Sequence, residues 1–379
     1  SSKQINRVNA VSLTGLEAGA TYYYQVGDGS VWSEVRSFTV PAAEKQTRFF
    51  LLADIQEEAA LEGMERIANH LAGQYPFGVQ LGDAVDNVRY YNQWEDALSL
   101  FTLDGIRNTD MIHVIGNHEA DDGGNNAIAA KSVFGVPAAW YSVERGDVYI
   151  AVLNHTSDKD TLQQFTQWLV EDAAKTTCTW KVLVTHVPAY YTNPTGGGET
   201  YVQYLPAACD AAGIDFYFSG NDHSYARTMV LKNGQPVSEA AQNGRLPATY
   251  GKGVLYYICG DLGEKSRSTE YKAVNNPDFH FAQVSQEYDS LYLAVEATAD
   301  AMTVRTYSVS AEGAQSLLDT YTMRVPASVC RDKGHDFSGD TVYVRDGKLV
   351  CSFCGQTVEL KDSGYTGWAR DEATGLRMY

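Results

Sequence analysis

The chain has 379 residues, 44% of them hydrophobic, and a formal net charge of −18, because 47 Asp and Glu residues outnumber 29 Lys and Arg residues. This length predicts two to four domains with a sizeable buried core, and the acidic balance argues against a surface for nucleic-acid backbones. No apolar run reaches the roughly 18 residues that a transmembrane helix needs. The first residues lack the apolar stretch of a signal peptide, so we expect any targeting segment to have been removed or to lie outside this chain.

The first region consists of short alternating runs separated by Gly-rich turns, which predict β-strands at residues 8–13, 21–26 and 35–40. The stretch from Leu16 to Val26 resembles the late-strand segment of fibronectin type III-like domains, where an aromatic strand follows an L-x-x-G-x-x-Y turn. A whole sandwich of this kind needs roughly 100 residues. We therefore expect residues 1–44 to be the C-terminal part of such a domain.

From Thr47 onward, strand-like runs alternate with amphipathic helical segments, which predicts a sheet covered by helices. Strands are expected at residues 48–53, 77–81, 111–115, 148–153, 181–185 and 216–219, and helices at 59–71, 94–101 and 162–174. Later runs look purely β, at residues 254–259, 291–297, 302–309 and 318–325. We expect these to form a second sheet, so that the fold class is α/β, a two-sheet sandwich flanked by helices over residues 45–326.

Five short polar motifs each follow a strand-like run. In chain order they are Asp54-x-Gln56, Gly82-Asp83-x-x-Asp86-Asn87, Gly116-Asn117-His118-Glu119, His186-x-Pro188 and Gly220-Asn221-x-His223. The ends of successive strands can deliver side chains to one point. Mixed carboxylate, imidazole and amide donors suit Mn, Fe or Zn better than Ca, and Asp83 is the natural carboxylate to bridge two ions. The order of the motifs predicts a two-metal hydrolase.

These motifs resemble those of the calcineurin-like metallophosphoesterases, and with the preceding β region the chain is most similar to the purple acid phosphatase branch over residues 8–325. Residues 219–228 are similar to the G-H-x-H-x-Y-x-R-T segment of the family, and residues 257–265 resemble its Gly-rich strand and loop. The resemblance implies that one metal takes Asp54, Asp83 and His223. It implies that the other takes Asp83, Asn117, His186 and Asn221.

Three positions depart from the family pattern. Asp86 stands where purple members have the tyrosine that colours their iron, so we do not expect a coloured ferric centre. Asn221 replaces a histidine with a weaker amide donor, so it is either a ligand of a less tightly bound second metal or a spacer. Gln56 replaces a histidine of many non-purple members and is either a ligand or a hydrogen-bond partner of bound water.

Some candidate residues also have structural explanations. Asp54 and Asp83 could cap the helices that follow them, and His186 and His223 could be core histidines, but the order of the motifs favours ligands. Glu119, grouped with His118 as catalytic, is expected to fix the His118 ring. The remaining histidines match no motif, although His155 follows a core strand and stays a candidate for the pocket rim.

The expected function is hydrolysis of small phosphomonoesters or phosphodiesters by a metal-activated water. The resemblance implies that His118 protonates the leaving oxygen or holds a phosphate oxygen. The alternative is a degenerate phosphoesterase that serves as an extracellular carbohydrate- or cell-wall-binding scaffold. The polar stretch from Thr192 to Glu199 is expected to be a loop that either overhangs the site or merely connects two elements.

Six cysteines fall into two groups. Cys178 and Cys209 either form a disulfide or remain isolated thiols. Residues 327–362 have the inventory and the C-x-x-C spacing of a structural zinc site, and the alternatives are a disulfide from Cys351 to Cys354 or to Cys330. The zinc ligands would be Cys330, His335, Cys351 and Cys354.

Residues 363–379 resemble the start of the aromatic and glycine repeats found in cell-wall-binding regions of Gram-positive surface proteins. This resemblance predicts a secreted or cell-surface bacterial protein, cut from a longer chain, whose flanking modules contact the cell wall or carbohydrate.

Overall fold

The structure is a computed structural model that describes residues 11–40, 46–56, 60–120, 128–239, 249–262, 273–286, 290–338, 342–375 and 377–378. The chain divides into two compact units. The first unit comprises Ser1–Val237, Gly251–Thr298 and Thr303–Tyr321, and the second comprises Ser238–Tyr250, Ala299–Met302 and Thr322–Tyr379.

A six-stranded sheet forms one layer of the α/β body, in the order β17-β16-β15-β3-β4-β5. Its strands are β3 (Thr47–Leu52), β4 (Phe77–Gln80), β5 (Asp110–His113), β15 (Ser290–Ala297), β16 (Ala301–Val309) and β17 (Gln315–Arg324). Strands β3, β4 and β5 are parallel to one another, and β15 runs antiparallel to β3. The carboxyl ends of β3, β4 and β5 therefore lie at one edge of this sheet.

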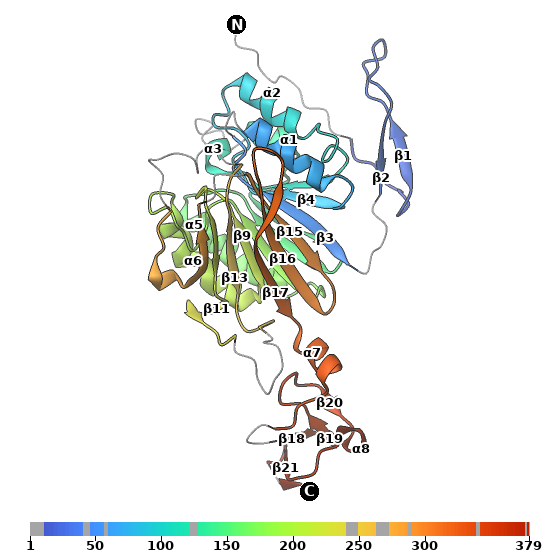
Figure 1. The fold of residues 1–379 in the computed structure, drawn as a ribbon, viewed down its shortest axis with the longest axis vertical. Coiled ribbons are helices and arrows are strands. Elements are labelled where there is room, and N and C mark those ends of the chain that lie inside the picture. The colour runs from blue at the N-terminus through green and yellow to red at the C-terminus, as the bar shows by residue number, and fades with distance from the viewer. Residues whose placement is uncertain are drawn as a thin grey trace. The chain divides into compact units, whose positions relative to one another are not determined.

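A seven-stranded sheet forms the other layer, in the order β14-β10-β13-β9-β8-β7-β6. Its strands β9 and β13 are labelled in Figure 1. Its strands are β6 (Trp140–Arg145), β7 (Val148–Leu153), β8 (Trp180–Thr185), β9 (Phe216–Ser219), β10 (Tyr225–Thr228), β13 (Leu255–Cys259) and β14 (Phe281–Ser285). The four central strands β7, β8, β9 and β13 are parallel. A hydrogen bond of 2.6 Å from the indole N–H of Trp180 on β8 to the carbonyl of Thr298 beyond β15 joins the two layers.

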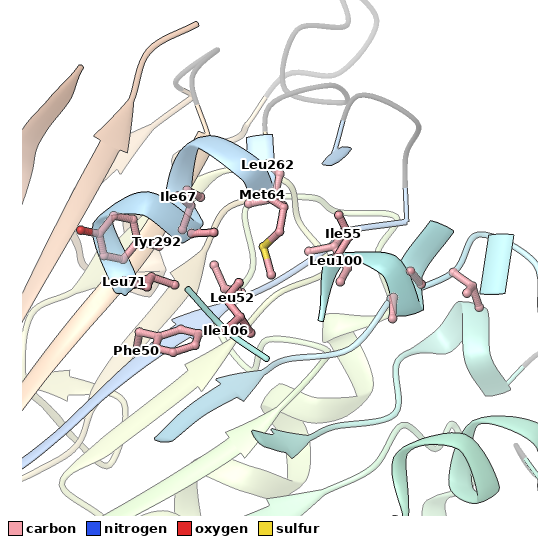
Figure 2. Close-up of a cluster of buried hydrophobic side chains, with 14 of the residues drawn as sticks. Phe50, Leu52, Ile55, Met64, Ile67, Leu71, Leu100, Ile106, Leu262 and Tyr292 are labelled. Carbon is pink, nitrogen blue, oxygen red and sulfur yellow. The ribbon is translucent and has the colours of Figure 1, made fainter. Parts of the chain in front are cut away.

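Helices cover both sheets. They are α1 (Ala60–Leu71), α2 (Tyr91–Leu100), α3 (Asn117–Ala120), α4 (Ile128–Phe134), α5 (Lys159–Ala173) and α6 (Gly198–Ala212). Figure 2 shows Met64, Ile67 and Leu71 of α1, which recur at helical spacing, beside Phe50 and Leu52 of β3. Each such buried side chain contributes roughly 1.5–3 kcal/mol.

The helices α5 and α6 cover the seven-stranded sheet, where Phe165 of α5 and Leu205 of α6 share a buried cluster with Tyr149 and Tyr217 of β7 and β9. The two-sheet sandwich flanked by helices is therefore confirmed. No described helix is long and apolar enough to cross a lipid bilayer.

The strands are divided between the sheets differently from the expectation. The later β segments do not make a sheet of their own: β13 joins the central strands, and β15 pairs with β3. Buried strands are apolar on both faces, so their sequences do not encode which strand lies beside them. Helix α6 was also missed, because Pro206 interrupts its helical pattern and it begins at Gly198, inside the expected loop.

At the N-terminus, β1 (Thr21–Tyr24) and β2 (Arg36–Thr39) form an antiparallel hairpin in which Tyr22 stacks on Phe38 with ring centroids 5.8 Å apart. Of the first expected strand, at residues 8–13, residues 8–10 lie outside the described residues and residues 11–13 form no strand. Short pieces complete the first unit: β11 (Leu231–Lys232), β12 (Gln235–Pro236) and the 3-10 helix η2 (Pro277–Phe279).

The second unit contains helix α7 and a five-stranded sheet of order β20-β19-β18-β21-β22. Its elements are α7 (Pro326–Lys333), β18 (Val342–Arg345), β19 (Lys348–Val350), β20 (Thr357–Val358), α8 (Leu360–Ser363), β21 (Ala369–Asp371) and β22 (Arg377–Met378). Strand β21 pairs in parallel with β18. A boundary between two modules was expected after residue 362. Strands on both sides of that position belong to one sheet.

Candidate metal centre

The expected ligands lie at the carboxyl ends of parallel strands in both sheets. Asp54 follows β3, Asp83 follows β4, and Asn117 follows β5 as the first residue of α3, whereas His186 follows β8, and Asn221 and His223 follow β9. One ligand atom from each of Asp54, Asp83 and His186 lies within 4.8 Å of the other two, and all three residues are buried. The structure therefore brings side chains from opposite layers of the sandwich to one point.

His186 is oriented by its own backbone contact. Its Nδ1 lies 2.8 Å from the carbonyl oxygen of Leu81, so Nδ1 carries the proton and donates it there. Its Nε2 lies 3.1 Å from Oδ2 of Asp83 and 2.9 Å from Oδ1 of Asn117. An unprotonated Nε2 and these two oxygens would repel each other in this buried place, so the contact requires a proton or a metal ion between them.

The electrostatics of this cluster favour positive charge. Burial lowers the pKa of His186, but the charges of Asp83 and Asp54 outweigh burial and raise the pKa to about 10. Burial raises the pKa of Asp83, yet His186 and His118 bring it down to about 2. The buried carboxylates stabilise a proton or a metal ion at this point, so the donor set fits a bound cation.

His223 approaches the cluster from the side of Asp54. Its Nε2 lies 3.6 Å from Oδ1 of Asp54, and its Nδ1 lies 3.1 Å from Oδ2 of Asp261. A carboxylate on Nδ1 fixes the ring and leaves Nε2 as the ligand atom, which is a common arrangement around metal-binding histidines. Asp261 was missed as a site residue, although it lies two residues beyond the end of β13 and obeys the same strand-end rule. Residues 263–265 of that segment lie outside the described residues.

The backbone at these positions adopts the left-handed conformation. Seven non-glycine residues in the described part of the chain have positive φ, and four of them are expected ligands: Asp54 (53°), Asp83 (55°), Asn221 (68°) and His223 (51°). Such conformations cost about 1–3 kcal/mol each and persist where the surroundings enforce them. Here the backbone N–H of Asn221 donates to both carboxylate oxygens of Asp54, at 3.1 and 2.9 Å.

The glycines of the motifs leave room for the ligands. A Cβ on Gly220 would lie 2.6 Å from Oδ2 of Asp54, and one on Gly82 would lie 2.7 Å from Nδ1 of His186. A Cβ on Gly116 would overlap the carboxylate of Asp83. Side chains at these positions would displace the ligands, so close packing of the cluster requires glycine.

Glu119 holds the ligand loops together. Its buried carboxylate accepts hydrogen bonds from the backbone N–H groups of Asp83 (2.8 Å), Ala84 (2.5 Å), Val85 (3.0 Å) and Gly116 (2.7 Å). The expectation that Glu119 fixes the His118 ring was wrong, because its carboxylate oxygens accept hydrogen bonds from backbone N–H groups in the loops that follow β4 and β5. Glu119 is a positioning residue for Asp83.

His118 is instead fixed by Asp86. Its Nδ1 lies 2.7 Å from the carbonyl oxygen of Asp86 and 3.3 Å from the carboxylate of the same residue. Its backbone N–H donates to Oδ1 of Asp83, and its Nε2 lies 3.7 Å from Oδ2 of Asp83. The His118 side chain is 30% exposed, so its Nε2 can meet a molecule that enters from solvent.

Asn221 and Gln56 occupy different places around the cluster. The side-chain amide N–H groups of Asn221 donate to the carbonyl of Gly196 (3.1 Å) and to Oδ1 of Asp222 (3.0 Å), which leaves its carbonyl oxygen as the atom available to a metal. Gln56 is buried two residues beyond Asp54. The other carboxylate oxygen of Asp222 accepts from the backbone of Thr192 (2.6 Å), so the segment before α6 is tied to the site.

His155 lies at the edge of the same cluster. It is half-buried, and burial together with the nearby His186 lowers its pKa to about 4. Its Nδ1 is buried and has no hydrogen-bond partner among the described residues.

The cluster of Asp54, Asp83 and His186 contains no cysteine. All six are free thiols, so Cys178 and Cys209 do not form a disulfide. In the second unit the ligand atoms of four expected zinc ligands lie within 4.8 Å of one another: Cys330, His335, Cys351 and Cys354.

The chain is similar to known phosphoesterases in sequence and in fold. Residues 2–40 match the family model of the purple acid phosphatase N-terminal domain, and residues 47–225 match the model of the calcineurin-like phosphoesterases. Among curated relatives, purple acid phosphatase 22 of Arabidopsis thaliana is 25% identical over 265 residues, which are 65% of this chain and 58% of the relative. The Fe(3+)-Zn(2+) purple acid phosphatase 12 of the same plant is 25% identical over 284 residues, 66% of this chain and 58% of the relative.

The chain thus spans 58% of the length of these relatives. A purple acid phosphatase from yellow lupin (Lupinus luteus) seeds superposes with a TM-score of 0.66 at 17% identity, over 82% of this chain and 61% of that structure. At this identity the similarity shows a common fold.

Proposed function

Because the chain belongs to the calcineurin-like phosphoesterase family, with purple acid phosphatases among its relatives, we propose that it hydrolyses small phosphate esters at the candidate metal centre. The observation that carries the proposal is the convergence of Asp54, Asp83 and His186 from two sheets within 4.8 Å. Neither helix capping nor core packing requires such a convergence of buried acceptors.

The candidate ligands divide into two sets that have Asp83 in common. One ion would be held by Asp54, Asp83 and His223, with Gln56 nearby, and the other by Asp83, Asn117, His186 and Asn221. When bound, the ions supply an activated water and offset the negative charge that develops on the phosphoryl group. Iron, manganese and zinc all suit these ligands, and one relative is named as an iron and zinc enzyme.

The residues of the chain supply positioning and proton transfer. The Nδ1 of His118 is held by Asp86, so its Nε2 is left to protonate the leaving oxygen or to bind a phosphate oxygen. Glu119 holds the loops that carry Asp83 and Gly116. Asp261 orients His223, and Asp222 ties the segment before α6 to the site.

The test is release of phosphate, or cleavage of aryl phosphate mono- and diesters, by the full chain loaded in turn with iron, manganese and zinc. Metal content is measured on the same samples. We expect activity in the unmodified chain, loss in Asp83→Asn and His118→Ala, and no change in Asp278→Asn, an exposed carboxylate on η2. Verified metal occupancy without any turnover of either ester class would contradict the proposal and favour the binding scaffold.

We also propose that the protein is secreted or attached to a cell surface and contacts carbohydrate or cell wall there. The support is the aromatic and glycine-rich sequence of residues 363–379. A pull-down of the full chain on purified Gram-positive cell wall tests the contact. Recovery of all of the protein in the unbound fraction would refute it.

A further inference from the structure

The second unit has a very small hydrophobic core. Its buried apolar cluster consists of Val342, Val344, Leu349 and Ala369, with Phe337 and Tyr365 partly buried against it. At about 25 cal/mol per Å² of buried apolar surface, such a core stabilises the unit by only a few kcal/mol before the chain entropy is counted. Small modules of this kind depend on disulfides or on a structural metal.

Four side chains in this unit point to a metal rather than to a disulfide. The sulfurs of Cys330 and Cys351 lie 3.6 Å apart, and the sulfur of Cys354 lies 3.5 Å from Nδ1 of His335. A disulfide requires a sulfur separation of about 2.05 Å. In a tetrahedral zinc site, bonds of about 2.3 Å to sulfur and about 2.05 Å to nitrogen place two sulfurs about 3.8 Å apart and a sulfur and a nitrogen about 3.6 Å apart.

The local backbone is arranged around Cys351. The backbone N–H of Asp336 donates to its sulfur at 3.2 Å, a contact that favours the thiolate over the thiol. The N–H of Gly355 donates to the carbonyl of Cys351 at 2.9 Å, and Gly355 has φ 72°, so the turn that carries the C-x-x-C pair closes at a glycine. The pair is thus held in one tight turn between β19 and β20.

The other two ligands come from a different element. Cys330 lies near the end of α7, and His335 follows that helix directly after Gly334, whose φ is 80°. Cys330 and Cys351 are buried, while His335 and Cys354 are half-buried. Four ligands from two elements leave no open coordination position, which is typical of a structural zinc site and not of a catalytic one.

We propose that Cys330, His335, Cys351 and Cys354 bind one zinc ion that joins α7 to the β-sheet of the second unit. The ion is separate from the metal centre of the first unit and takes no part in phosphate ester hydrolysis. It supplies the stability that the four-residue apolar core lacks, because a metal site that forms only in the folded state adds its binding free energy to folding.

The first test is zinc content of the full chain by elemental analysis. We expect one zinc ion that persists in the double variant Asp54→Asn/Asp83→Asn and is lost in Cys351→Ser/Cys354→Ser. The matched control is Cys178→Ser, since Cys178 is a free, half-buried cysteine of the first unit. Equal zinc content in the double cysteine variant and the control would overturn the proposal.

The second test uses no cysteine variant. Cobalt exchanged into the unmodified chain should give thiolate-to-cobalt charge-transfer absorption that survives in Asp54→Asn/Asp83→Asn. A chelator should make residues 322–379 sensitive to limited proteolysis, and added zinc should reverse this. A disulfide found by mass spectrometry of the non-reduced protein, or cobalt spectra without sulfur ligation, would each refute the zinc site.

Discussion

The Nε2 of His186 lies 3.1 Å from Oδ2 of Asp83, although the two residues come from different sheets and are 103 positions apart in the chain. The other ring nitrogen donates to the carbonyl of Leu81, so Nε2 is the atom that shares a proton or a metal ion with the carboxylate. A proton or a metal ion between the two groups is needed to make this buried contact favourable. The two layers of the sandwich are therefore coupled through a buried charge that must be compensated.

The first prediction concerns Asp83. Asp83→Asn removes the carboxylate that both ions would share, so metal binding and hydrolysis should fall together, the rate by about 10³-fold or more. Elemental analysis and initial rates on an aryl phosphate measure the two effects. Retention of both metals with loss of activity would show that Asp83 acts in some way other than as a ligand.

The second prediction concerns Asp261, which fixes Nδ1 of His223 at 3.1 Å. Asp261→Asn should weaken metal affinity by about 10–100-fold, because the ring loses its charged partner while the ligand atom remains. Excess metal should restore the rate, which it would not do for Asp83→Asn. Titration of apo-protein with metal, with Asp278→Asn as the matched surface control, distinguishes these cases.

The third prediction concerns colour. The chain has Asp86 at the tyrosine position of the purple branch, and its carboxylate lies beside His118. Iron-loaded protein should therefore show no tyrosinate absorption in the visible range, whereas Asp86→Tyr should gain a visible band if the new phenolate reaches the ion. A strong visible band in the unmodified protein would contradict the assignment of position 86.

The fourth prediction concerns Glu119, whose buried carboxylate accepts four backbone N–H bonds. Glu119→Gln replaces one acceptor with a donor and leaves backbone groups unpaired, so the free energy of unfolding should fall by about 2–4 kcal/mol. Urea denaturation measures this change. An unchanged midpoint together with lost activity would indicate a direct chemical role instead.

The fifth prediction concerns pH. His113 stacks on Phe134 with centroids 4.1 Å apart and meets Phe101 edge-on at 5.0 Å, and burial lowers its pKa from 6.5 to about 3. In the unfolded chain His113 takes up a proton below about pH 6.5, so its contribution to stability is present above that pH and is lost as the pH falls toward 3.

Replacement by an apolar ring removes this dependence. His113→Phe should flatten the fall in unfolding free energy between about pH 7 and about pH 4 by roughly 3 kcal/mol. Denaturant titrations at both pH values measure it. Leu317→Phe, at an exposed position of β17, serves as the control and should keep the slope of the unmodified protein.

Local sequence was enough to identify the side chains that converge at the candidate centre. An apolar run followed by Asp54, Asp83 or His186 marks the end of a buried strand that carries a polar side chain, and both properties depend on neighbouring residues only. The spacing of Cys351 and Cys354 is local in the same sense. The order of such motifs also indicated the family and the class of fold.

Tertiary structure alone decided how these pieces meet. Leu51 of β3 pairs with Leu293 of β15. Asp261, which lies just beyond β13, contacts His223, although β13 was expected in the other sheet. The carboxylate of Glu119 accepts hydrogen bonds from the backbone of Asp83 and Gly116 and does not fix the ring of His118. The reason is physical. A strand that is buried on both faces is apolar throughout, so its sequence indicates that the strand is buried but does not indicate which distant segment packs against it.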